Sequence, residues 1–282
     1  MTQRRDGREQ SLQMLWPGGR TAAATCSWDD GTVSDRRMVS VLNHHGIAAT
    51  FFLNSGKLGM SAKESGLRDY VDADEVARLY AGHEVGGHTL DHPSLLALSD
   101  NGVTHQIAGD RQRLEELTGS EVTGFAPPFG DVDERVRRIA AECGTTYCRG
   151  IAATGAFAVP PDPMRWEPTT HCLDGIAERW RDFLATPGPT RLFSIWGHSY
   201  EYDDRQRWDE WEDFCATATA TVGDEPGVWW GTHASVVDYC TAWRALSWPA
   251  PGLLANDTSR DLWVRWADRD VVVAAHCAAQ LS

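Results

Sequence analysis

The chain has 282 residues, of which 42% are hydrophobic and 23% charged, and its formal net charge is −14. This composition is typical of a folded globular protein with a substantial core. The negative charge argues against nucleic-acid and anionic-membrane partners, because no basic surface would attract phosphate. We find no apolar run long enough to cross a membrane and no signal-peptide pattern, so we expect a cytoplasmic protein with one domain over residues 1–282.

Strand-like and helix-like segments alternate along the chain. Gly46 is a good helix-ending residue, and Asp72 and Glu75 have capping-box spacing. In chain order we expect a strand over 21–27, a helix over 34–46, a strand over 47–53, a helix over 72–82, a strand over 83–87, a helix over 99–118, a strand over 121–125, helices over 133–143 and 173–184, a strand over 191–196, a helix over 205–220, a strand over 228–230 and a helix over 234–243.

This alternation covers about 240 residues and predicts a parallel sheet. We favour an α/β fold, a distorted (β/α) barrel of about seven strands that spans about 20–245. Residues 156–163 are rich in proline and small side chains and are predicted to be a loop. In the C-terminal extension, about 250–282, residues 262–266 and 271–275 are predicted to form a β-hairpin.

The seven cysteines do not suggest a structural role. Their number is odd, their spacing is wide, and no CxxC pair occurs. We therefore expect neither a disulfide framework nor a structural zinc site.

An Asp-Asp-Gly sequence, Asp29 to Gly31, follows the first predicted strand. At a strand end, two adjacent carboxylates can take different roles, one binding a cation and the other facing the water on that cation. Alone, the motif is also explained by an ordinary Asp-Gly turn.

Two histidines four residues apart, His88 and His92, follow the strand predicted over 83–87. Pro93 disfavours helical geometry at His92, so we expect a strand end and a tight turn. With one aspartate, the two imidazoles would make a three-ligand site that leaves a position open for water, which is the catalytic arrangement. Unrelated histidines are the alternative explanation.

A Pro-Pro-Phe-Gly loop, 127–130, follows the strand predicted over 121–125. The two prolines stiffen it, so the backbone N–H of Phe129 can be aimed at a developing oxyanion. A plain rigid loop would have the same sequence.

A single histidine, His198, follows the apolar strand predicted over 191–196. Imidazole suits a general acid because its pKa lies near neutrality. A hydrogen-bonded structural histidine is the alternative. Since all four motifs follow strands, and the carboxyl ends of barrel strands form one face, we expect them to meet in one active site.

The order of these motifs resembles the polysaccharide deacetylase family, also called NodB-homology or carbohydrate esterase family four. The resemblance covers roughly Thr21 to Trp243. It implies a distorted (β/α) barrel and a divalent metal, zinc first, with Co²⁺, Ni²⁺, Fe²⁺ or Mn²⁺ as alternatives. It also implies hydrolysis of N-acetyl groups on amino sugars, or of other C–N bonds in more distant relatives.

The resemblance also implies roles for individual residues. Asp29 matches the catalytic base and His198 the general acid, while the backbone amide of Phe129 matches an oxyanion contact. The metal ligands of the family match Asp30, His88 and His92.

Two departures from the family pattern concern charged partners. Ala126 stands where the family has an arginine that orients the base, and Arg165 could supply the missing charge from another strand. The carboxylate that tunes the acid histidine has three candidates, Glu201, Asp162 and Glu167. The Gly-His-Ser-Tyr-Glu run, 197–201, and the pair His171-Cys172 indicate a sub-branch unlike the wall-degrading members.

We expect a small N-acylated molecule as substrate, and the sequence does not indicate an oligomeric state. A flat indole can stack on a sugar ring, and the chain has 13 tryptophans. The predicted substrate contacts are Trp28, Pro128, Arg165, Trp166, Trp196, Tyr200 and Glu201. The alternatives are another C–N hydrolase, acting on a cyclic imide, ureide or formamide, and a non-catalytic carbohydrate-binding relative.

Overall fold

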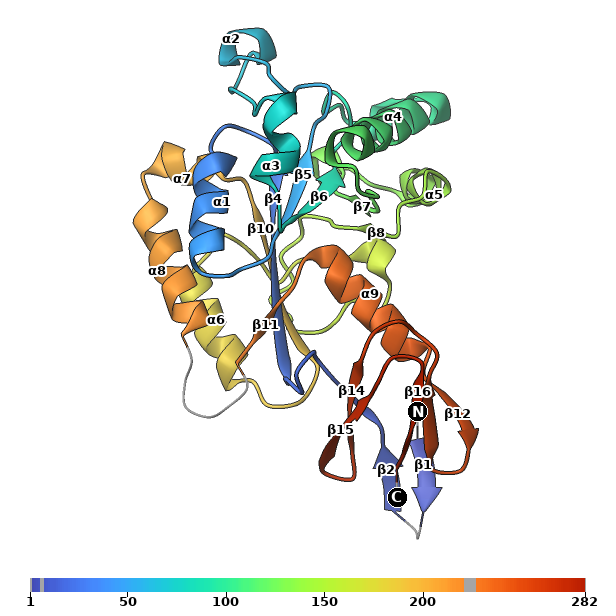
Figure 1. Cartoon of the computed structure of the whole chain (residues 1–282). Helices are drawn as coiled ribbons and strands as arrows, with labels where there is room; N and C mark the ends of the chain where they lie inside the picture. Colours follow the sequence, from blue (N-terminus) through green and yellow to red (C-terminus); the bar gives the residue numbers. More distant parts are fainter. Residues whose placement is uncertain (1, 6–7, 221–226, 282) are drawn as a thin grey trace.

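A computed structural model describes residues 2–5, 8–220 and 227–281. Its centre is a curled parallel sheet with the strand order β8-β7-β6-β5-β4-β10-β9, and the short strand β11 pairs with β4 beside this path (Figure 1). The seven strands of the path form a half-barrel, which confirms the expected α/β class. Their bounds are Ala22–Asp30 (β4), Thr50–Leu53 (β5), Glu84–Gly87 (β6), Gly124–Phe125 (β7), Tyr147–Cys148 (β8), Thr170–His171 (β9) and Arg191–Gly197 (β10), with Trp229–Trp230 for β11.

Helices cover the outside of the sheet. Their apolar faces pack on the strands, and α1, α6, α7 and α8 lie on one side while α4 and α5 lie on the other (Figure 1). The helices are Asp35–His44 (α1), Ala62–Ser65 (α2), Val76–Leu79 (α3), Asp100–Thr118 (α4), Glu134–Glu142 (α5), Ile176–Ala185 (α6), Tyr200–Arg205 (α7), Trp208–Thr219 (α8) and His233–Arg244 (α9). Short 3-10 turns span Ala73–Glu75 (η1), Leu95–Ala97 (η2), Pro128–Gly130 (η3) and Pro163–Arg165 (η4).

The two ends of the sheet are joined by the segment that leads into β9. The backbone N–H of Gly150 donates to the carbonyl of Trp166 (2.8 Å), and that of Trp166 donates to Cys148 (3.1 Å). Further along, the N–H of Thr169 donates to Ser194 of β10 (2.8 Å). The sheet is therefore continued from β8 to β10 by these bonds, and side chains fill the space inside the curl.

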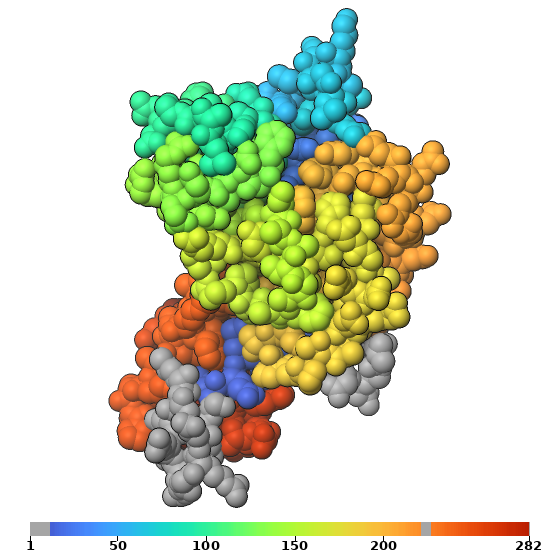
Figure 2. Space-filling view, turned by 180° about the vertical axis from the view of Figure 1, so that it is seen from behind, coloured from blue at the N-terminus to red at the C-terminus, as the bar shows by residue number. Residues whose placement is uncertain are grey.

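A small antiparallel β region lies at the other end of the molecule from the carboxyl ends of β4 and β5 (Figure 1). Figure 2 shows from behind that it forms a narrower part below the body. The predicted hairpin is present as Leu262–Trp266 (β14) and Arg269–Val273 (β15). The other strands are Thr2–Arg5 (β1), Arg8–Ser11 (β2), Gln13–Leu15 (β3), Ser247–Ala250 (β12), Leu253–Asn256 (β13) and Cys277–Gln280 (β16).

Most of the predicted elements are present, with differences in their bounds. The helix predicted over 205–220 is wrong at its start, since α7 and α8 meet at Gln206, whose φ of 54° breaks the helix. The helix predicted over 72–82 is a 3-10 turn followed by α3. Residues 156–162 form a loop as predicted, and Pro163 begins η4. All seven cysteines are free thiols, and no helix in the described residues combines the length and apolarity of a membrane span.

Candidate active site

The four motifs meet at the carboxyl ends of the parallel strands. Asp29 and Asp30 end β4, His88 directly follows β6, and His198 directly follows β10. The rigid loop that contains Phe129 follows β7. The expectation that these segments share one face is therefore confirmed.

Three side chains converge on one point. The Nε2 atoms of His88 and His92 each lie 3.5 Å from Oδ1 of Asp30, and the three ligand atoms lie within 4.8 Å of one another. Burial lowers the pKa of both imidazoles, that of His92 to about 4, so both rings are neutral near pH 7. A neutral imidazole is the form that coordinates a metal.

The ring of His88 is oriented from behind. Its Nδ1 lies 2.6 Å from the carbonyl oxygen of Ala126, which can only accept, so the proton is on Nδ1 and Nε2 has a free lone pair. The backbone of His88 is held as well, since its N–H donates to the buried carboxylate of Asp110 (2.9 Å), which also accepts from the N–H of Ser55 (2.8 Å). Asp110 on α4 was missed by the sequence reasoning because it is 22 residues away from His88.

These residues fit a divalent metal ion. Oδ1 of Asp30 is buried and has no hydrogen-bond partner among the described residues, which is costly unless something positive binds it. One carboxylate and two imidazoles with free Nε2 atoms are the donor set of a catalytic three-ligand site. The fit to a metal therefore rests on the chemistry and the convergence of these donors.

A buried arginine pairs with Asp29. Nη2 of Arg149 donates to Oδ1 of Asp29, and the exposed fractions of the two residues are 0% and 2%. Arg149 also donates to the carbonyl of Gly150 (3.1 Å), and its guanidinium lies over the rings of Phe52 (5.2 Å) and Trp196 (5.1 Å). Burial alone would raise the pKa of Asp29, but Arg149 and nearby imidazoles bring it below its ordinary value, so the carboxylate is charged.

Arg149, rather than Arg165, therefore supplies the charge beside Asp29. Arg165 is half exposed and pairs instead with Glu134 (2.6 Å) and Asp162 (3.4 Å). The prediction that Arg165 reaches the site is wrong, because the turn Pro163–Arg165 (η4) places it on the surface beside α5. Arg149 follows β8, a strand of two residues that the sequence reasoning did not identify.

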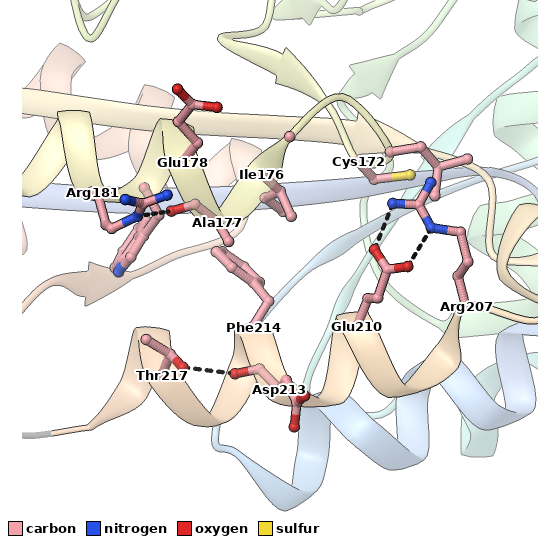
Figure 3. Close-up of a pocket in the computed structure, with 13 residues that line it drawn as sticks. Cys172, Ile176, Ala177, Glu178, Arg181, Arg207, Glu210, Asp213, Phe214 and Thr217 are labelled. Carbon is pink, nitrogen blue, oxygen red and sulfur yellow. Dashed lines mark hydrogen bonds and ion pairs between the residues drawn. The ribbon is translucent and has the colours of Figure 1, made fainter.

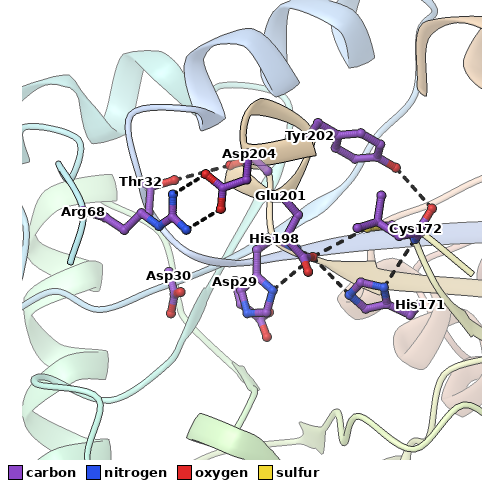
Figure 4. Close-up of polar contacts among 12 residues, drawn as sticks. Asp29, Asp30, Thr32, Arg68, His171, Cys172, His198, Glu201, Tyr202 and Asp204 are labelled. Atoms are coloured by element: carbon purple, nitrogen blue, oxygen red, sulfur yellow. Dashed lines mark hydrogen bonds and ion pairs between the residues drawn. The ribbon is translucent and has the colours of Figure 1, made fainter. Parts of the chain in front are cut away.

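The histidine that follows β10 is held by a carboxylate of the next helix. Nδ1 of His198 lies 3.3 Å from Oε2 of Glu201, and the backbone N–H of His198 donates to the same oxygen (3.1 Å) (Figure 4). Burial acts to lower the pKa of His198, but Glu201 and the aspartates of β4 raise it above its ordinary value. Asp162 and Glu167, the other candidates, contact other groups, Arg165 and the N–H of Ala152.

The Pro-Pro-Phe-Gly loop contributes an exposed aromatic ring at the edge of the site. Phe129 is 60% exposed, has a φ of 61°, and its ring packs edge-on against His92 at 4.6 Å. Pro128, in contrast, is buried, so it supports the loop and is not free to contact a substrate.

The aromatic residues predicted to contact substrate divide into two groups. Trp28 and Trp166 are 0% and 1% exposed and pack against other core rings, so the prediction for them is wrong. On β4 the side chain of Trp28 points to the opposite side from Asp29, because neighbouring strand residues alternate. Trp196 and Tyr200 are partly exposed and lie beside His198, with ring distances of 5.8 and 5.0 Å.

A separate cavity of about 540 Å³ lies between α6 and α8 (Figure 3). It is lined by Ile176, Trp180 and Phe214, with the ion pair of Arg207 and Glu210 at one end. None of the residues at the carboxyl ends of β4, β6 or β10 that were described above lines it.

Comparison with known proteins agrees with this geometry. A family model described as polysaccharide deacetylase matches residues 19–148, which contain both aspartates of β4, the two histidines after β6 and the Pro-Pro loop. Over residues 19–148 the chain is therefore similar to the polysaccharide deacetylase family. The match ends one residue before Arg149 and does not include His198.

Two curated relatives have named activities. Chitin deacetylase 1 of Cryptococcus neoformans is 29% identical over 142 residues, which cover 50% of this chain and 28% of that protein. A peptidoglycan-N-acetylglucosamine deacetylase of Listeria monocytogenes is 34% identical over 112 residues, 39% of this chain and 22% of that protein. The matched region thus spans less than a third of either relative.

Solved structures share the fold over a longer part of the chain. A Mycobacterium smegmatis protein assigned to the polysaccharide deacetylases has a TM-score of 0.59 at 18% identity, and the match covers 85% of this chain and 98% of that one. The CE4 domain of a multidomain xylanase from a Trinervitermes trinervoides hindgut metagenome has a TM-score of 0.50 at 13% identity, covering 78% and 92%. At these identities the similarity concerns the fold.

Proposed function

We propose that this protein is a metal-dependent hydrolase that removes an N-acetyl or other acyl group from an amino sugar or a similar small acylated amine. One observation carries the proposal: a charged base and a histidine acid lie beside the same three-ligand site, and each is fixed by its own charged partner. These are the pairs Asp29–Arg149 and His198–Glu201. A protein that only binds sugars or metal needs neither pair.

The ligands Asp30, His88 and His92 would hold the cation. A divalent cation there supplies positive charge that polarises the substrate carbonyl and makes water more acidic. Asp29 is charged and acceptor-only, and Arg149 occupies one of its oxygens, so the other can take the proton of the attacking water.

The remaining steps concern the oxygen and nitrogen of the scissile amide. The backbone N–H of Phe129 donates to the oxygen as negative charge develops on it, a contact of about 3 kcal/mol in comparable enzymes. His198 donates from Nε2 to the departing nitrogen, because Glu201 occupies its Nδ1 side. An amine leaves readily only once it is protonated.

Acetate release is the direct test. The protein, supplied with Zn²⁺ or Co²⁺, is assayed on N-acetylglucosamine, chitin oligosaccharides and peptidoglycan fragments, beside a cyclic imide, a ureide and a formamide. We expect acetate release from the acetylated amines. Hydrolysis of the imide, ureide or formamide alone would replace the proposal with a different C–N hydrolase.

Asp29→Asn provides the matched control for this assay. It removes the base but keeps the size of the side chain, so it should bind the metal as the wild type does and lose turnover by about 10²–10⁴-fold. If the variant keeps near-full activity, the base is misassigned. If the wild type contains no metal and stays inactive after added Zn²⁺, Co²⁺ and Ni²⁺, a non-catalytic relative is the better description.

A further inference from the structure

A second cluster of possible metal ligands lies beside the general acid. His171 at the end of β9, His198 after β10 and Glu201 on α7 have their ligand atoms within 4.8 Å of one another (Figure 4). Oε2 of Glu201 is the common centre, 3.1 Å from Nε2 of His171 and 3.3 Å from Nδ1 of His198. Two histidines and one glutamate could either bind a second metal ion or form a network of hydrogen bonds among themselves.

The hydrogen bond on the far side of His171 distinguishes these two interpretations. The backbone N–H of Leu173 donates to Nδ1 of His171 (3.3 Å), so the Nδ1 lone pair is already used. The proton of the neutral ring is then on Nε2, which faces Glu201. A cation at Nε2 would have to displace that proton, whereas a hydrogen bond from Nε2 to the carboxylate needs no change.

We propose that His171 is a positioning residue for the general acid, which donates its Nε2–H to Glu201 and so moderates how strongly Glu201 holds His198. This inference depends on the proposed function only in treating His198 as the general acid. The network itself is a property of the folded chain, because three N–H donors share one carboxylate oxygen, with the thiol of Cys172 as a more distant fourth donor. The three N–H donors are Nε2–H of His171, Nδ1–H of His198 and the backbone N–H of His198.

Sharing the carboxylate oxygen of Glu201 among several donors changes the protonation of His198 in a predictable direction. Each donor removes part of the negative charge that Glu201 presents to His198. The backbone N–H of His198 (3.1 Å) keeps the carboxylate in place if the His171 donor is lost. Loss of that donor therefore leaves Glu201 more negative toward His198 and makes the protonated form of His198 more stable.

Other charged and titratable groups face the pair and must stay constant in any test. Asp29 and Asp30 of β4 and Tyr200 of α7 lie on the His198 side. The thiol of Cys172 is 3.9 Å from Glu201, and burial raises its pKa, so it remains protonated. Trp196 packs edge-on against His171 at 4.8 Å, which a phenylalanine at position 171 can reproduce.

The test compares His171→Phe, which keeps an aromatic ring but has no donor, with His171→Gln, whose side-chain amide can replace the Nε2–H. Ring-nitrogen NMR of ¹⁵N-histidine-labelled protein, loaded with one equivalent of Zn²⁺, gives the tautomer of His171 and the pKa of His198. We expect an Nε2–H tautomer, a rise in the pKa of His198 by roughly 0.5–1 unit in His171→Phe, and a return close to the wild-type value in His171→Gln. His105→Phe on the exposed face of α4 is the control.

Four results would overturn the inference. Three of them are an Nδ1–H tautomer of His171, an unchanged pKa of His198 in His171→Phe, and the same shift in both variants. The fourth is movement of the His171 and His198 ring signals on adding a second equivalent of Zn²⁺, which would make the cluster a metal site. If the NMR results are as expected but the wild type hydrolyses no amide, the proposed function fails and the network stands. If amides are hydrolysed, the alkaline limb of kcat/KM should move upward with the pKa in His171→Phe.

Discussion

Replacing Arg149 tests whether the buried ion pair stabilises the base in its charged form. In Arg149→Met the side chain still fills the space between Phe52 and Trp196, but Asp29 loses its only arginine contact in the described residues. Both partners are almost fully buried, so the carboxylate would remain as an uncompensated buried charge. Breaking such a pair by removing one partner costs about 3–5 kcal/mol of folding free energy.

The same change should alter the pH profile. Burial raises the pKa of Asp29 and Arg149 lowers it, so without the arginine the pKa rises. More of the base is then protonated near pH 7, and the acid limb of kcat/KM moves to higher pH. Urea unfolding measures the stability, and acetate release from an N-acetylated amino sugar between pH 5 and 9 measures the profile.

A double-mutant cycle with Asp29→Asn separates the pair from simple packing. In the background of the Asp29→Asn variant no buried charge is left behind, so Arg149→Met should cost clearly less than in the wild type. Arg165→Met is the surface control and should change stability by no more than about 0.5 kcal/mol. An equal cost of Arg149→Met in both backgrounds would refute the ion-pair argument, and so would an unshifted acid limb.

Three further changes test the rest of the site. Zn²⁺ at about 100 times its Kd should stabilise the wild type by about 2.7 kcal/mol and Asp30→Asn by much less, as thermal unfolding with and without metal will show; equal stabilisation would contradict the ligand assignment. Glu201→Gln should lower the pKa of His198, since Glu201 raises it, and move the alkaline limb of kcat/KM to lower pH; an upward shift would be inconsistent with the pair. Burial raises the pKa of Asp35 to about 7, so the folded state binds more protons there than the unfolded state and loses stability as pH rises from about 4 through 7. In Asp35→Asn that loss should be absent, so urea unfolding at pH 5 and 8 should show a smaller decrease than in the wild type, and an identical decrease would argue against it.

The sequence allowed the strand-end residues to be predicted because short-range signals mark them. Asp30, His88 and His198 each lie at the end of a segment that the sequence predicts to be a strand, and the parallel topology then places them on one face. The partners of these residues could not be found in the same way. Arg149 follows a strand of two residues, which is too short to show the alternation of polar and apolar side chains that identifies a strand. It also contacts Asp29 across a separation of 120 residues in the sequence.

The predicted substrate contacts failed for a related reason. Trp28 is adjacent to Asp29 in sequence, but strand alternation sends the two side chains to opposite faces. Trp166 lies on the segment that joins the two ends of the sheet, where its ring packs on Tyr147 and His233 in the interior. Tryptophan content alone does not distinguish a packed interior ring from a sugar-stacking one.

Backbone conformation is the part of the site that residue types could least reveal. Asp30, Thr89, His92 and Phe129 all have φ between 61° and 84°, a region that costs a non-glycine residue about 1–3 kcal/mol. All four lie at the carboxyl ends of β4, β6 and β7. A strained backbone persists only where contacts with neighbouring residues hold it in place. The residues that make those contacts are therefore part of the site.

For the histidine loop, that source is helix α4. Gln106 accepts from the N–H of Leu90 with its backbone carbonyl (3.2 Å) and from the N–H of Asp91 with its side chain (3.1 Å). One turn further along, Asp110 accepts from the N–H of His88 (2.9 Å). A helix that has no residue among the candidate ligands thus fixes the left-handed turn that brings His92 back to His88. The spacing of the two histidines predicts a metal site. The hydrogen bonds from α4 hold the loop in the conformation that brings both side chains together outside a helix.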